Sequence, residues 1–177
     1  SVLIFNRLHG DHYAMFLYLL SNTVWKADQN EQLASKIFLL NKALHGIDAF
    51  YSVELPEIFL FIHPVGTILG KAQYKNYFAV YQNCTVGASE DNSYPFFSEE
   101  ILMYSKSSVI GDCNIGRNVV FAANTSLINT NIKDNNEYKY KQLPSGKLGC
   151  IVDNVTGYAC NVEYIGRTKV QGFTFVL

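Results

Sequence analysis

The stretch MYSKSSVIGDCNIGRNVVFAANTSLI, residues 103–128, has an apolar residue at every sixth position. The apolar residues at this interval are Met103, Val109, Ile115, Phe121 and Leu127. A helix has a period of 3.6 and a strand a period of two, so neither produces this interval over such a length. An interval of six is typical of a parallel solenoid with triangular coils, in which each edge of the triangle takes six residues. We therefore predict a β-solenoid whose core is one stacked inward residue per edge.

A second set at the same interval precedes this stretch. It consists of Ile62, Ile68, Tyr74, Val80 and Val86. Small residues follow some of the inward positions, as Gly87 follows Val86, and these suit the tight corners of a coil. The register breaks between residues 87 and 102, where the polar run Ser89–Pro95 predicts a loop extruded from the solenoid. Loops held on a rigid scaffold are frequent places for binding groups.

The first third of the chain has a helical pattern. One segment is expected to start near Asp11, which could cap it, and a second carries Leu33, Ile37, Leu40 and Leu44 at steps of four, three and four. This spacing is that of an amphipathic helix. Gly46 follows as a C-terminal stop. We expect the two helices to bury these faces against each other as a hairpin.

These patterns predict an α+β fold in three parts. An N-terminal α-helical segment takes residues 1–52, a parallel β-helix takes residues 53–132, and a short irregular β extension takes residues 133–177. The extension has turn signals at 144–146 and strand-like stretches at 150–152 and 173–176. It would cover the open end of the solenoid, whose last coil otherwise leaves backbone groups unpaired.

Composition narrows the class of protein. The formal net charge is -1, so the electrostatic basis for nucleic-acid binding is missing. The longest apolar run, 13–20, is too short to span a bilayer, and no signal peptide is recognisable at the start. The four cysteines contain no CxxC pair, which argues against a zinc site and favours reduced thiols. We expect a cytoplasmic protein without a metal.

Three segments resemble the hexapeptide-repeat acyltransferases, most closely the serine acetyltransferases. HPVGTILG at 63–70 resembles that family's HATGIVVG, YQNCTVGA at 81–88 resembles LQSVTLGG, and VIGDCNIGRN at 109–118 resembles ILGNIEVGRG. The resemblance covers residues 43–131 and implies a left-handed parallel β-helix. It also implies a homotrimer with active sites in the clefts between neighbouring solenoids, and acetyl-CoA as co-substrate.

His63 begins the most specific of these segments and is the predicted general base. A hydroxyl needs a base to remove its proton as it attacks a thioester, and the imidazole of histidine suits that task near neutral pH. The other histidines, His9, His12 and His45, lie in the helical part and are expected to be structural. A catalytic histidine also needs an acid partner. We favour Glu54 for this role, with Glu57 as the other candidate.

The resemblance implies further site residues. Gly87 and Ala88 match the segment that lines the thioester and could donate backbone N–H groups to the oxyanion. Ala122, Ala123 and Ser126 match the groove for CoA, with Lys106 or Arg117 as possible phosphate contacts. In the extruded loop the family has Arg-His-Pro, whereas this chain has Ser93-Tyr94-Pro95. That change removes a carboxylate clamp and makes Tyr94 an aromatic acceptor-binding residue of the kind that suits a sugar.

The sequence thus predicts an acetyl-CoA-dependent O-acetyltransferase acting on a small-molecule acceptor, either serine or a sugar of a surface polysaccharide precursor. Two alternatives stay open. One is an amino-sugar N-acetyltransferase on the same fold, although the helical start lacks the α/β nucleotide-binding unit expected there. The other is a solenoid scaffold without catalytic activity, in which replacing His63 would change no activity.

Overall fold

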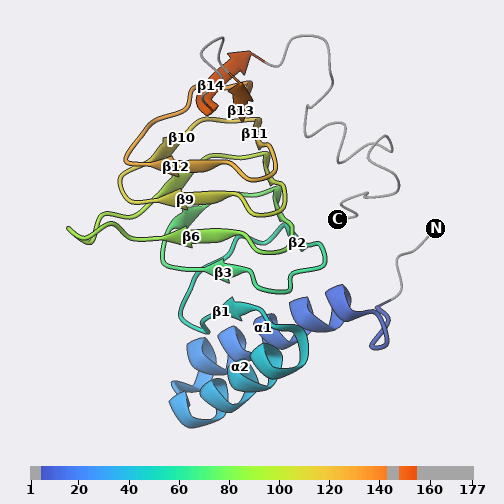
Figure 1. Cartoon of the computed structure of the whole chain (residues 1–177). Coiled ribbons are helices and arrows are strands. Elements are labelled where there is room, and N and C mark those ends of the chain that lie inside the picture. The colour runs from blue at the N-terminus through green and yellow to red at the C-terminus, as the bar shows by residue number, and fades with distance from the viewer. Residues whose placement is uncertain (1–4, 143–147, 155–177) are drawn as a thin grey trace.

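The computed structural model describes residues 5–142 and 148–154. Two helices form a hairpin beneath a stack of short strands, with Gly10–Asp28 as α1 and Glu31–His45 as α2 (Figure 1). Asn30 caps α2 by accepting the N–H of Leu33 at 3.0 Å. Gly46 ends the helix in the left-handed conformation, with φ of 66°, as predicted.

The leucine pattern of α2 does not form the contact predicted for it. Leu33, Leu40 and Leu44 are all more than two-fifths exposed, and Ala34 and Asn41 are the buried positions. Small residues let the two helices approach closely, and the Asn41 side-chain amide donates to the Ala14 carbonyl of α1 at 2.9 Å. The prediction of a hairpin is therefore confirmed, whereas its buried face is a different one.

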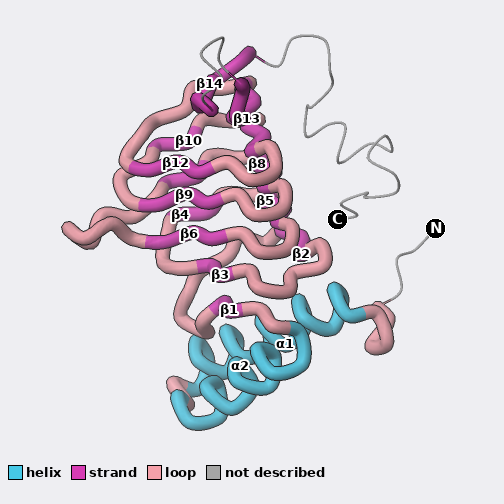
Figure 2. Tube along the Cα trace, in the orientation of Figure 1, coloured by secondary structure: helices cyan, strands magenta, loops and turns pink. Residues whose placement is uncertain are grey.

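Above the hairpin, strands stack into three sheets, one on each side of a triangular coil, and every pairing is parallel except that of the last strand (Figure 2). The first sheet contains Asp48–Ala49 (β1), Ile68–Leu69 (β3), Thr85–Gly87 (β6), Ser108–Ile110 (β9) and Ser126–Ile128 (β12). The second sheet contains Phe59–Phe61 (β2), Phe78–Val80 (β5), Ile101–Met103 (β8), Val119–Phe121 (β11), Asn136–Gln142 (β13) and Leu148–Asn154 (β14). The third sheet contains Gln73–Tyr74 (β4), Phe96–Phe97 (β7) and Asn114–Ile115 (β10).

Most of the residues predicted from the interval of six do lie in the solenoid core. Met103, Val109, Ile115, Phe121 and Leu127 are all at most 1% exposed. Aromatic rings fill the interior of the earlier coils, where Tyr74 stacks on Phe97 with ring centroids 5.4 Å apart. Burying such rings is the main contribution to stability that this core can make.

Two of the predicted inward residues are wrong. Ile68 is 47% exposed, and its neighbour Leu69 is buried instead. Ile62 is buried outside the coil, where it packs with Ala79, Leu102 and Val120 on the outer face of the second sheet. The inward residues there are Phe61 and Leu69, eight positions apart, so the first coil has two extra residues at this corner.

The two ends of the solenoid are both covered. The first strand, β1, pairs with β3 and already belongs to the solenoid, so the coils begin before the predicted boundary at residue 53. At the other end β13 continues the second sheet beside β11, and β14 pairs with it antiparallel. The strand predicted at 173–176 lies outside the described residues. In the described part, no helix is long and apolar enough to cross a membrane.

Candidate active site

His63 lies in the bend that the two extra residues create, between β2 and β3. In the later coils, the corner between the second and first sheets has one residue with positive φ, and Asn83, Lys106 and Asn124 take that position. In the first coil Gly66 occupies the corresponding position, with φ of 75°. His63, three residues earlier, is a second residue in the left-handed conformation at this corner, with φ of 49°. A left-handed conformation at a residue other than glycine costs energy and is enriched at functional sites. The bend leaves the His63 side chain 75% exposed.

A carboxylate from α1 lies beside this histidine. Asp11, in the first turn of α1, accepts the backbone N–H of His63 at 3.1 Å through Oδ1. Its other oxygen, Oδ2, is 3.7 Å from Nδ1 of the His63 ring. The Asp11 side chain is only 13% exposed, so the protein shields it from water while the imidazole stays accessible.

Glu54, the predicted acid partner, is not the carboxylate that the structure brings to His63. Its side chain forms an ion pair with Lys26, in the last turn of α1. Asp11 and Lys26 are fifteen residues apart, which corresponds to about 22 Å along a helix at 1.5 Å per residue. Glu54 and His63 therefore contact opposite ends of the same helix. The sequence pattern missed Asp11 because it is 52 positions from His63.

The other predicted site residues lie on two different edges of the solenoid. Ala122 and Ala123 follow β11 on the edge where His63 follows β2, and Ser126 begins the strand after that corner. Gly87 ends β6, and Ala88 starts the loop on the next edge, between the first and third sheets. The site predicted from the sequence is thus divided within one copy of the chain.

Tyr94 belongs to this second edge. Its loop projects away from the coils between β6 and β7 (Figure 1). Hydrogen bonds within the loop give it a defined shape, since Asp91 accepts the Ser89 hydroxyl at 2.5 Å and the Ser93 N–H at 3.3 Å. The ammonium of Lys71 lies over the Tyr94 ring, 5.0 Å from its centroid. Sequence reasoning did not anticipate this cation beside Tyr94.

The two basic residues considered for CoA phosphates differ in their surroundings. Arg117 makes a bidentate ion pair with Glu100, with Nε and Nη2 at 3.0 and 2.9 Å from the two carboxylate oxygens. This pairing raises the pKa of Arg117 further and occupies its guanidinium. Lys106 is exposed at a corner on the edge that carries His63. Of the two residues, Lys106 is the better placed to contact a ligand on that edge.

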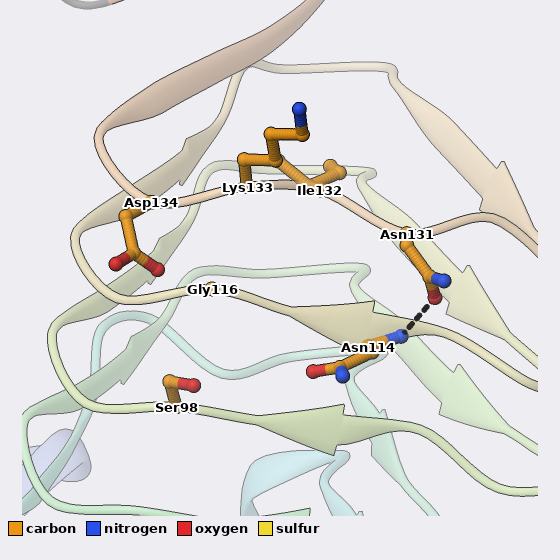
Figure 3. A pocket seen from close by; sticks show the side chains of 7 residues that line it. All are labelled: Ser98, Asn114, Gly116, Asn131, Ile132, Lys133 and Asp134. Atoms are coloured by element: carbon orange, nitrogen blue, oxygen red, sulfur yellow. Dashed lines mark hydrogen bonds between the residues drawn. The ribbon is translucent and has the colours of Figure 1, made fainter.

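A hollow of about 530 Å³ lies elsewhere, on the outer side of the third sheet (Figure 3). It is lined by Ser98, Asn114, Gly116, Asn131, Ile132, Lys133 and Asp134. Its polar groups are partly used to hold adjacent coils together, since Asn131 accepts the Asn114 N–H at 2.8 Å and Asp134 accepts the Arg117 N–H at 2.8 Å. It contains no histidine, so the predicted chemistry does not belong there.

Within residues 5–142 and 148–154, no group of three or more histidine, cysteine, aspartate or glutamate side chains could hold a metal ion. The thiols of Cys84 and Cys113 are buried and free, and burial raises the pKa of both. They are therefore protonated at neutral pH and poorly suited as nucleophiles.

The fold has clear relatives among solved structures, although no protein-family model and no curated protein matches the sequence. Serine acetyltransferase from Brucella abortus superposes with a TM-score of 0.70 at 15% identity, over 84% of this chain and 58% of that one. Isoform 3 from Entamoeba histolytica, in complex with cysteine, gives 0.67 at 21% identity, over 77% and 49%. The Neisseria gonorrhoeae serine acetyltransferase gives 0.69 at 14% identity, over 86% and 59%.

These structures share the left-handed parallel β-helix and the preceding helices with this chain, which confirms the predicted fold. The chain spans 49% to 59% of the length of these three proteins. The Brucella abortus protein has also been solved in complex with coenzyme A.

Proposed function

We propose that this protein is an acetyltransferase that moves an acetyl group from acetyl-CoA to the hydroxyl of a small acceptor, with His63 as general base. The observation that carries this proposal is the exposed imidazole of His63 in a bend that interrupts the regular coils, with the Asp11 carboxylate bonded to its backbone N–H and 3.7 Å from its ring Nδ1. The fold shared with serine acetyltransferases supports the choice of thioester chemistry.

In this reaction Nε2 of His63 accepts the proton of the acceptor hydroxyl while the hydroxyl oxygen attacks the thioester carbonyl carbon. The new C–O bond gives a tetrahedral intermediate, and its negative oxygen is stabilised by backbone N–H groups at Gly87 and Ala88. The C–S bond then breaks, and the leaving CoA sulfur takes the proton from His63. The products are an acetyl ester and free CoA thiol. The CoA chain runs past Ala122, Ala123 and Ser126 on the edge of the later coils.

Catalysis requires a homotrimer in this proposal. His63 is on one edge of the solenoid, whereas Gly87, Ala88 and Tyr94 are on the next edge. A neighbouring copy that presents its loop edge to the His63 edge would complete the site. The closed symmetry of a trimer gives three identical sites of this kind.

The acceptor is proposed to carry a carboxylate, as serine does. The family's Arg and His are missing from the loop, but the ammonium of Lys71 over the Tyr94 ring supplies one positive charge at that place. A carboxylate would bind this charge, and a neutral sugar would not. Replacing Lys71 by Met should therefore raise KM for serine and leave KM for acetyl-CoA unchanged.

The proposal is tested by incubating the protein with acetyl-CoA and either serine or a panel of sugars, and following free CoA thiol. We expect acceptor-dependent release that His63→Ala lowers by at least about a hundredfold, the usual scale for loss of a general base. His9→Ala removes another exposed histidine, whose side chain makes no capping hydrogen bond to α1, and should keep full activity. Release that is equal in wild type and His63→Ala would reject the assignment, and absence of release with all acceptors would reject the activity.

The shared site can be tested separately by mixing two variants, each impaired on a different edge. His63→Ala lacks the base, and Tyr94→Ala lacks the loop aromatic ring. When both chains are co-expressed, trimers that contain both should regain activity, because some clefts then combine an intact His63 edge with an intact loop edge. Light scattering should give the mass of three chains. Activity that is no higher in the mixed trimers than in either variant alone would mean that each site is formed within one copy.

A further inference from the structure

We propose that Asp11 is the positioning residue for His63, so that the helical hairpin is part of the active site rather than a separate N-terminal segment. This inference rests on the proposed role of His63 as general base. It replaces Glu54 by a carboxylate that lies in the first turn of α1.

The carboxylate of Asp11 lies close to two parts of His63, its backbone N–H and its side-chain ring. Oδ1 of Asp11 accepts the His63 backbone N–H at 3.1 Å, and Oδ2 lies 3.7 Å from the ring Nδ1. The first contact holds the left-handed backbone of His63, whose φ is 49°. The second favours the tautomer with the proton on Nδ1, because that N–H then faces a negative charge. Nε2 is left with its lone pair free, as a general base requires.

His45, the other histidine whose titration Asp11 affects, is uncharged at neutral pH and leaves the negative charge of Asp11 to His63. His45, at the end of α2, lies close enough for Asp11 to influence its titration, but burial lowers the pKa of His45. Its Nδ1 is 2.8 Å from Oδ1 of Asn41, and the amide nitrogen Nδ2 of Asn41 donates to the Ala14 carbonyl. At neutral pH His45 is therefore a neutral member of a hydrogen-bonded chain and does not compete for the Asp11 carboxylate.

Contacts further along α1 keep Asp11 in place. The hydroxyl of Tyr18 donates to the Val53 carbonyl at 2.6 Å and accepts the Leu55 N–H at 3.0 Å. Asn22 donates to the Tyr51 carbonyl at 2.7 Å. These buried bonds join the helix to the segment just before β2. The position of Asp11 relative to His63 is thus set by the docking of the whole hairpin.

The experiment compares three carboxylates. Asp11 is replaced by Asn, which keeps the oxygen for the backbone N–H but loses the charge, and by Ala, which loses both. Glu54→Gln and Asp48→Asn are the matched controls, because these acids are paired with Lys26 and Lys42. The ¹⁵N shifts of the His63 ring are read without substrate near pH 8.5, where imidazole is uncharged. The steady-state constants for acetyl transfer are then measured for each variant.

We expect wild type and both controls to have the His63 proton on Nδ1. Asp11→Ala should shift it toward Nε2, the form that a histidine side chain free in water prefers. Both Asp11 variants should lower kcat at least about tenfold, a part of the whole general-base effect, with both KM values within about twofold. Asp11→Glu should restore part of kcat.

An unchanged tautomer in Asp11→Ala would overturn the proposal, as would a tautomer shift in Glu54→Gln or Asp48→Asn instead. The tautomer measurement needs no turnover. It therefore tests Asp11 even if the protein transfers no acetyl group, which separates failure of this inference from failure of the proposed function.

Discussion

Removing the Tyr18 hydroxyl should weaken the docking of the hairpin by an amount that depends on pH. Tyr18 is 2% exposed, and its hydroxyl bridges the Val53 carbonyl and the Leu55 N–H. Each such bond contributes about 1 kcal/mol net, so Tyr18→Phe should lower the free energy of unfolding by about 2 kcal/mol at pH 8. Burial raises the pKa of Tyr18 from 10.0 to about 12, with a smaller opposing effect from the Leu55 N–H.

The raised pKa fixes the sign of the pH dependence. The unfolded chain loses this proton at a lower pH than the folded one, so the contribution of Tyr18 is complete below pH 10 and declines as pH rises towards 12. A shift of two units corresponds to about 2.7 kcal/mol at 1.36 kcal/mol per unit, and half of it, about 1.4 kcal/mol, is lost by pH 11. The difference between wild type and Tyr18→Phe should therefore shrink to less than about 1 kcal/mol at pH 11.

Urea denaturation followed by circular dichroism at pH 8, 10 and 11 measures this difference. Tyr81, whose pKa burial also raises, is present in both proteins and cancels in the comparison. Burial raises the pKa of Tyr74 well above its ordinary value, and a smaller part of that rise comes from the charge of Tyr18 and is absent in Tyr18→Phe. Tyr13→Phe, on the same helix, is the control, since the contacts of its ring are with Phe16 and His45. A gap between wild type and Tyr18→Phe that stays constant from pH 8 to pH 11 would refute the reasoning, as would a gap below about 0.5 kcal/mol at pH 8.

Three further variants test the coils and the hairpin, each by urea denaturation. Gly66→Ala should cost about 1–2 kcal/mol for the left-handed backbone alone, and more because its Cβ would be 2.3 Å from Oδ1 of Asn83, whereas a Cβ at Gly10 would meet only the His45 ring at 4.0 Å, so Gly10→Ala should be neutral or stabilising. Phe97→Ala should cost about 3–5 kcal/mol, because the ring is fully buried. Leu40→Lys should change stability by less than about 0.5 kcal/mol, because this leucine is 45% exposed, and a larger loss would mean that another copy covers it.

The solenoid was predictable because one apolar residue per edge is a strong repeating requirement. That requirement identified the buried residues from Tyr74 onward. It failed at Ile62 and Ile68, where an insertion of two residues preserved an interval of six while moving the inward position to Phe61 and Leu69. Periodicity cannot detect such an insertion, because the residue at the interval of six and the residue that is actually buried are both apolar, as in the pairs Phe61/Ile62 and Ile68/Leu69. The predicted buried face of α2 was wrong for a related reason, because an amphipathic pattern does not say what the apolar face contacts.

His63 could be found because its segment resembles a known one, whereas its partner could not. Asp11 reaches His63 only through the docking of α1, which depends on Tyr18 and Asn22 binding backbone groups of the 51–55 segment. No spacing rule relates those positions. Glu54 was one of two acids shortly before His63 that fitted an acid-before-histidine order, and Lys26 holds it at the far end of the helix.

Because Asp11 reaches His63 through the docking of α1, Tyr18→Phe can show separately how that docking affects stability and how it affects catalysis. Its hydroxyl is remote from the reacting atoms, so Tyr18→Phe should alter turnover only if the hairpin carries Asp11 away from His63. At pH 8 and low temperature, where the variant remains folded, a drop in kcat together with a shift of the His63 ring proton towards Nε2 would show that coupling. Unchanged kcat and tautomer in folded Tyr18→Phe would mean that the contacts of Asp11 with His63 hold the end of α1 without help from Tyr18. The pair of measurements therefore decides whether the hairpin positions Asp11 as a rigid unit or only through its first turn.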